Sequence, residues 1–489
     1  MKVKQIFDAI TEVRDEYIEE ARTTQLKKSA IAWKKWTMIV AACIVMAIGI
    51  RGAYSLPDLL PFGGKAGGSG SGHGESSTFM SYAGPAFPLT LSQPDNTVTA
   101  TRNIIYDFSL PNEDSIRVWG ANVEDRYTLI NSSTEEKNIE AVYPFIGSFN
   151  DLKELIPTIT VNGQKEHPAL YAGGYSGGEK LDSWEGYKAL LEDGSYQSNA
   201  FAADPVLSQP VTVYAFTDFE APLEYEAATQ AISFNIDPDK TTILHYGFNG
   251  IDIGDNGFRR YSYFVPKDIR MEKDIKLLII IGEDIKDYSL QGYKNGACER
   301  GNELEGVSST VTRKEQILSD VMGEVINHFF TNYDDGNSLA VSQEMFLGAV
   351  TEFMVHYGLL SDNARDHYQY GVLEDVILET YSLKRVFYLK FQVSVPVGES
   401  VLVTVKMRKN PSYDFICSGT DNKGIQGYDM VTRLGSNLHF DALTAELTST
   451  QNIEIVRQNY GFNLSQGVTE VELDLNNEHY YLEIRPVEQ

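Results

Sequence analysis

The chain has 489 residues, of which 42% are hydrophobic and 11% aromatic, enough to build large cores in two or more domains. Its formal net charge of −27 at pH 7 argues against nucleic-acid binding and against a body that lies on an anionic lipid surface. The three cysteines, Cys43, Cys298 and Cys417, are too few for a fold that depends on disulfides. One disulfide, between Cys298 and Cys417, is conceivable.

The first 30 residues predict an acidic amphipathic helix. Apolar residues recur at helical spacing and acidic residues fill most other positions. Because so short a helix has no core of its own, we expect a cytoplasmic protein to cover the stripe. The alternative is a helix that only pairs with itself or remains loosely ordered. The expected apolar contacts are Ile6, Ile10, Val13 and Tyr17, and the acids expected to meet a basic partner are Glu12, Asp15 and Glu16.

A single uninterrupted apolar run, Trp36 to Ile50, follows this helix. As a helix it would span roughly 22 Å, less than a hydrocarbon core of about 30 Å. Extension to residue 53 and snorkelling of Lys35 and Arg51 would close the difference. We therefore predict a transmembrane helix over residues 36–53.

Basic residues before the run set its orientation. They are Arg22, Lys27, Lys28, Lys34 and Lys35, with no acid between them. Positive flanks stay in the cytoplasm, which predicts a single-pass protein of the cell membrane with its N-terminus cytoplasmic and its C-terminus extracytoplasmic. A cleaved signal peptide and a lipid anchor at Cys43 fit less well, because about 35 residues precede the run and the segment after Cys43 remains apolar.

The segment from Ile6 to Ala21, IFDAITEVRDEYIEEA, followed by a basic stretch and an Ala-Ala-Cys-containing apolar run, resembles the start of a group of single-pass membrane proteins of clostridia and their relatives. The resemblance covers about the first 50 residues. It implies an anti-sigma-factor-like regulator whose cytoplasmic head binds a sigma factor. A pair of aspartates at the centre of the group's pattern is replaced here by Arg14-Asp15.

Residues 54–78 are rich in Gly, Ser and Pro and predict a flexible linker. Short alternating runs after it predict an extracytoplasmic β-sandwich-like domain over residues 79–238. Its expected strands include Thr158 to Val161, which ends at the turn Asn162-Gly163. Short helices are expected at Phe149 to Leu155 and at Trp184 to Leu191.

The remainder, residues 239–489, predicts an α+β domain. Lys276 to Gly282 is an apolar run typical of a buried strand. Helical periodicity then covers about residues 313–381, in three stretches that begin at Arg313, Gln343 and Asn363. Strand patterns return from Val386 onward and predict a C-terminal β-sandwich. The expected fold class is mainly β with a helical insertion.

No convincing catalytic, cofactor or metal motif is present. His328, His356 and His367 lie near carboxylates such as Glu352 and Glu374 in the sequence, but none are spaced as a His-x-x-x-His metal pair. The segments Asp252 to Gly257 and Asp334 to Asn337 have calcium-loop composition without the EF-hand pattern, so solvated turns are favoured. Cys298 has an acidic neighbour, which opposes thiolate formation.

These patterns favour a membrane signalling protein whose outer region senses or binds and whose head holds a cytoplasmic regulator, a sigma factor being the expected one. The second hypothesis is a cell-surface binding or adhesion protein anchored by its N-terminal helix. An extracellular hydrolase, its site assembled from distant residues, is the third. No enzyme activity, cofactor or metal is predicted.

Overall fold

The structure is a computed structural model. It describes residues 83–109, 120–175, 188, 205–222, 224–225, 227–266, 275–332, 339–356, 358–360, 370–415 and 421–487. The chain separates into two compact units, Met1–Pro61 and Phe62–Gln489, and all described residues lie in the second. The expected head, membrane segment and linker lie outside the described residues. No helix among the described residues is long and apolar enough to cross a membrane.

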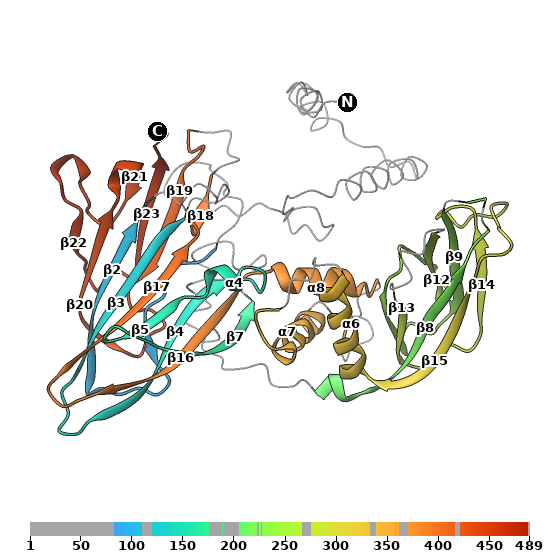
Figure 1. The fold of residues 1–489 in the computed structure, drawn as a ribbon, viewed down its shortest axis with the longest axis horizontal. Coiled ribbons are helices and arrows are strands. Elements are labelled where there is room, and N and C mark those ends of the chain that lie inside the picture. The colour runs from blue at the N-terminus through green and yellow to red at the C-terminus, as the bar shows by residue number, and fades with distance from the viewer. Residues whose placement is uncertain are drawn as a thin grey trace. The chain divides into compact units, whose positions relative to one another are not determined.

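The described chain is mainly β with a smaller helical part, which confirms the expected α+β class (Figure 1). Its strands form five sheets. Three sheets, built from strands on both sides of a long insertion, are named here the split sandwich. The other two, built from residues 210–317, are named the inserted sandwich.

The split sandwich has one large sheet and two smaller ones. In spatial order the large sheet is β22 (Glu470–Glu472), β20 (His439–Thr448), β2 (Val98–Asp107), β3 (Ala121–Asn131), β17 (Ser400–Lys409), β5 (Thr158–Val161) and β6 (Gln164–Lys165). One smaller sheet is β1 (Thr90–Leu91), β4 (Lys137–Gly147), β16 (Arg385–Val395) and β7 (Ala169–Tyr175). The other is β18 (Tyr413–Asp414), β19 (Gln426–Val431), β23 (His479–Pro486) and β21 (Ile453–Gln458).

In two of these sheets, strands from before and after the insertion pair with one another, as the neighbouring blue and red ribbons of the large sheet in Figure 1 show. β4 pairs antiparallel with β16 over their full lengths, and β2 pairs in parallel with β20. One end of the large sheet packs against β4 and β16, through residues such as Tyr127 and Phe387. Its other end packs against β19 and β23, through residues such as Tyr106 and Leu482. Neither half of the chain can complete this core alone.

The inserted sandwich has two four-stranded sheets. The first is β10 (Thr241–Tyr246), β13 (Lys276–Gly282), β8 (Pro210–Glu220) and β15 (Ser308–Ile317). The second is β11 (Gly250–Ile253), β12 (Phe258–Pro266), β9 (Ala227–Asn235) and β14 (Tyr288–Tyr293). Aromatic rings such as Phe216, Phe248 and Tyr263 meet edge to face between the sheets.

Three longer helices follow the inserted sandwich: α6 (Leu318–Asn332), α7 (Gln343–His356) and α8 (Leu373–Ser382). Shorter helices are α4 (Leu152–Leu155) and the 3₁₀ turns η2 (Pro205–Ser208), η5 (Thr450–Asn452) and η6 (Leu464–Gln466). Apolar residues of α6, α7 and α8 share a core with Leu277 and Ile279 of β13, while Leu278 and Ile280 face the sandwich interior. β13 is therefore buried on both faces, which explains its uninterrupted apolar sequence and confirms the predicted buried strand.

Three expectations need correction. The boundary expected near residue 238 falls between β9 and β10, whose side chains share the core of the inserted sandwich, so residues 79–238 and 239–489 are not separate domains. The C-terminal strands likewise build their sandwich with β2 to β5 and not alone. The helix expected from Arg313 begins at Leu318, because residues up to Ile317 pair with β8 as the end of β15.

Gly371 joins the helical region to β10. Its φ is +63°, its carbonyl accepts a hydrogen bond from His245 N at 2.8 Å, and a Cβ built on it would lie 2.0 Å from the Ile243 carbonyl oxygen. Gly398, in the turn between β16 and β17, has a similar φ of +69° and nothing within 4 Å of that position. Substitution of Gly398 by alanine would therefore introduce backbone strain alone, whereas substitution of Gly371 would introduce both strain and a steric clash.

We predict that Gly398→Ala lowers the free energy of unfolding by about 1 kcal/mol, the cost of the left-handed conformation. Gly371→Ala adds a backbone clash and should cost about 3 kcal/mol or more. Denaturant unfolding of both variants checks this. Equal losses would show that the segment around Gly371 does not pack against β10 as described.

Candidate functional site

A fully buried ion pair lies inside the split sandwich. Arg102 on β2 donates from Nε and Nη2 to the two carboxylate oxygens of Asp125 on β3, at 2.9 and 2.8 Å. Both side chains have no exposed surface. Arg102 lies diagonally across from Asp125 in the pairing of β2 with β3, and side chains alternate between the two faces of the sheet. Both side chains therefore point into the core, where the guanidinium and the carboxylate form a bidentate pair.

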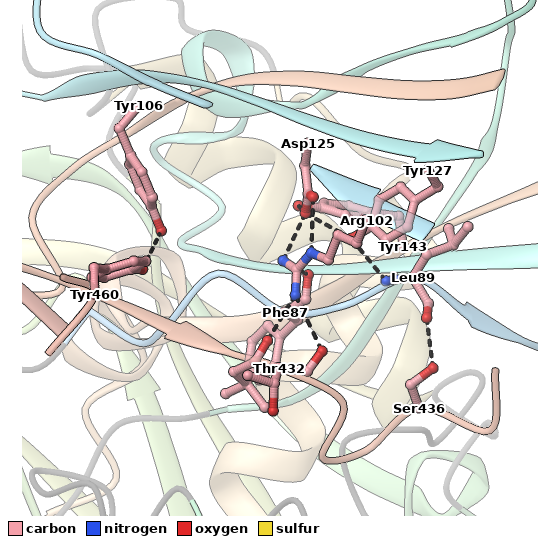
Figure 2. A network of polar contacts seen from close by, with 11 residues as sticks. Phe87, Leu89, Arg102, Tyr106, Asp125, Tyr127, Tyr143, Thr432, Ser436 and Tyr460 are labelled. Carbon is pink, nitrogen blue, oxygen red and sulfur yellow. Dashed lines mark hydrogen bonds and ion pairs between the residues drawn. The ribbon is translucent and has the colours of Figure 1, made fainter. Parts of the chain in front are cut away.

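Further polar groups complete this network (Figure 2). Arg102 Nη1 donates to the Val431 carbonyl at 2.7 Å, and Nη2 donates to the Phe87 carbonyl at 3.3 Å. The hydroxyls of Tyr127 and Tyr143 donate to Asp125 Oδ2 at 2.6 and 3.3 Å. Burial lowers the pKa of Arg102, but Asp125, together with Tyr127 and Tyr143, more than offsets this effect and keeps the pKa above its ordinary value.

Next to the network lies a cavity of about 30 Å³, named here the basic pocket. Four stretches of chain form it: the residues before β1, the middle of β4 with the end of α4, the residue before β16, and the end of β17. Its lining is Ala83, Pro85, Ala86, Phe87, Tyr143, Pro144, Phe145, Ile146, Leu155, Lys384, Met407, Arg408, Lys409 and Asn410. Phe87 and Tyr143 belong both to this wall and to the buried network, so the ion pair holds one side of the pocket in place.

The charged lining is entirely cationic. Lys384, Arg408 and Lys409 line the pocket, and none of its fourteen lining residues is Asp or Glu. Lys409 Nζ donates to the Gly84 carbonyl at 2.8 Å. Burial lowers the pKa of Lys409 to about 8; the charge of Asp429 opposes this shift and that of Lys384 adds to it. On a chain with net charge −27, this is a local reversal of sign.

The predicted partner-contact residues, Ile6, Ile10, Val13, Tyr17, Glu12, Asp15 and Glu16, all lie outside the described residues. The structure therefore leaves that prediction untested. The helical spacing of apolar residues pointed to the head. The sequence did not indicate the basic pocket, because its lysines and arginine come from segments that carry no motif.

Among the described side chains of the helical region, the carboxylates and histidines do not converge. His328 Nδ1 lies 3.0 Å from the Tyr246 hydroxyl, and Glu352 pairs with Arg385 at 3.4 Å. His367 lies outside the described residues, as does the side chain of His356. Within the described part of the chain, no three potential metal ligands are grouped.

The two calcium-like segments and Cys298 have other surroundings. The segment after Asp252 is the hairpin turn between β11 and β12, and Asp252 pairs with Arg260 at 2.7 Å. Residues 333–338, which include the second segment's acids, lie outside the described residues. Cys298 is buried, and burial raises its thiol pKa. Cys417 is outside the described residues, so its pairing is not tested.

Glu374, in the first turn of α8, contacts the inserted sandwich. Its Oε1 accepts a hydrogen bond from Gly247 N, and Oε2 is buried without a hydrogen-bond partner among the described residues. Burial raises its pKa to about 7, the neighbouring Asp375 adds to the rise, and the Gly247 N–H and Lys276 oppose it. A buried carboxyl that ionises near neutral pH makes this contact sensitive to pH.

The fold and the pocket define a β-rich protein with a split sandwich, an inserted sandwich and a helical part between them in sequence. No family model, curated protein or solved structure matches this chain in the three comparisons made.

We predict that Arg102→Met lowers the free energy of unfolding by about 3–5 kcal/mol, because Asp125 would remain buried without its cation. Adding Asp125→Leu should restore part of the loss, since the uncompensated charge is then removed. Arg126→Met, which removes a partly exposed cation on the same strand as Asp125, is the matched control and should cost less than about 1 kcal/mol. Additive losses in the double variant would contradict a coupled pair.

We also predict that Glu374→Gln makes the protein more stable at pH 8 by about 1–3 kcal/mol. The native pKa is above the unfolded one, so the stabilisation from Glu374 is complete below about pH 4.5 and is lost as pH rises through about 7. The variant and the native protein should therefore differ most at pH 8 and least at pH 4.5. Unfolding curves across this range check this, with the exposed Glu344→Gln on α7 as control.

Proposed function

We propose that this chain is a single-pass membrane signalling protein of the anti-sigma-factor-like type. Residues 1–35 would bind a cytoplasmic regulator, residues 36–53 would span the membrane, and the β-rich part would bind a ligand on the outer side. The observation that carries the proposal is the order of segments in the sequence: an acidic amphipathic stripe, a basic stretch, an apolar run and then a large β-rich body.

The proposed mechanism is a shift of populations. A ligand can change the state of the head only if it binds one state of the protein better than another. The basic pocket supports the proposal as a place for such a ligand, because four separate stretches of chain meet there and a movement of any one would alter the site. A bound ligand would then change the exposure of the head or of a cleavage site near the membrane.

The head is tested with the full-length chain in its native membranes. Ile10→Glu with Val13→Glu places two charges in the apolar stripe, and we expect at least a tenfold loss of a cytoplasmic protein that co-purifies with the native chain. Thr11→Glu with Thr23→Glu adds the same charge away from the stripe and should retain the partner. Mass spectrometry of the purified complexes identifies and quantifies it.

If the native chain and both variants recover the same proteins, the head has no specific partner. The cell-surface binding protein would then be the better description, with the N-terminal segment acting only as an anchor. Recovery of a sigma factor that the stripe variant alone loses would support the anti-sigma-factor-like type.

A further inference from the structure

We infer that the basic pocket binds the oxyanion group, a carboxylate or a phosphate, of a small ligand whose apolar part lies against the pocket's hydrophobic wall. This inference rests on the proposed function only in taking the ligand as the sensed signal. Binding itself can be measured whether or not the head has a partner.

Charge selects the ligand's sign. Lys384, Arg408 and Lys409 approach the cavity from two segments, and the lining contains no carboxylate. Lys384 is half-buried and forms no ion pair with any described residue. At physiological salt, the interaction between exposed charges is largely screened beyond about 8 Å. The nearby cations therefore outweigh the distant acids that give the chain its negative charge.

The surroundings of Lys409 leave a positive balance at the pocket. Its ammonium interacts with Asp429 on β19, which also lies 3.2 Å from His479 Nε2. One carboxylate thus faces Lys409 from outside the lining, whereas Lys384 and Arg408 are the other two cations of the lining. An incoming oxyanion would interact with these cations in a partly desolvated site, where charge-assisted hydrogen bonds are stronger than on the open surface.

Size and polarity restrict the ligand further. A cavity of about 30 Å³ has room for a head group of only a few atoms, so the rest of a ligand would extend out of it. Phe145, Ile146 and Met407 supply an apolar wall beside the cations. A carboxylate or phosphate head with a short apolar tail satisfies both parts of the lining, as is usual for small-molecule sites.

The rigidity of the wall favours binding. Tyr143 is held by Asp125, and the Phe87 carbonyl is held by Arg102. Both contacts belong to the buried network of Figure 2. Because these wall residues are ordered before a ligand arrives, less conformational entropy is lost on binding.

The test measures binding of hexanoate, inorganic phosphate and chloride to the purified full-length chain by calorimetry. We expect hexanoate or phosphate to bind with a Kd of about 0.1–10 mM, and chloride to bind at least tenfold more weakly. Preference for hexanoate assigns a carboxylate with an apolar tail, and preference for phosphate assigns a phosphate head. Equal binding of all three anions, or binding of none, overturns the inference.

Matched variants locate the site. Lys384→Ala should weaken binding at least fivefold and Lys384→Glu should abolish it, while Lys406→Ala, an exposed lysine on β17 that pairs with Glu124, should leave the affinity unchanged. Unchanged thermal unfolding shows that the variants are folded. Affinity should also fall several-fold between pH 7 and pH 9.5, as Lys409 loses its charge. An affinity that Lys384→Glu does not change overturns the inference, even if the head proves to bind a partner.

Discussion

The antiparallel pairing of β4 with β16 sets the frame of the described chain. Gly147 lies opposite Arg385, and Lys137 lies opposite Val395, so a strand from before the long insertion and the first strand after it are fixed side by side. The chain must therefore leave this sheet, form the inserted sandwich and α6 to α8, and return to the same sheet. The basic pocket depends on the same pairing, because Pro144 and Ile146 of β4 and Lys384 before β16 line it together.

The buried ion pair adds a second constraint. Arg102 and Asp125 connect neighbouring strands of the large sheet, and their remaining bonds reach Val431 of β19, Tyr143 of β4 and the Phe87 carbonyl. Removing two charges from water is costly, and the dense hydrogen bonding is what makes the pair tolerable. A polar network in this position penalises any packing in which the three sheets shift relative to one another.

Local structure was predictable where local chemistry decides it. The turn at Asn162-Gly163 is confirmed, with positive φ at both residues, as a two-residue hairpin requires. The apolar run of β13 also correctly indicated a buried strand, and the structure shows that both of its faces are covered. The end of β15 was mistaken for helix because Ile317 continues the apolar spacing of α6, whereas pairing with β8 determines its conformation.

Long-range features were not predictable in this way. Alternation shows that a segment is a strand but not which strand it pairs with, so the split of the large sandwich and the misplaced boundary at residue 238 follow from the same gap in the information. The basic pocket is another case, because nothing in the sequence around Lys384 and Arg408 distinguishes them from other surface residues. They line one cavity only because folding brings the apolar residues of β4 and β17 beside them.

The parallel contact of β2 with β20 has a consequence for biosynthesis. Residues 98–107 emerge from the ribosome long before their partners at 439–448. The inserted sandwich can fold while the chain is still growing, because all of its strands lie within residues 210–317. Until those late partners emerge, the apolar residues and edges of the early strands of the split sandwich remain exposed. Aggregation competes with folding during this interval, and chaperone binding would be most useful then.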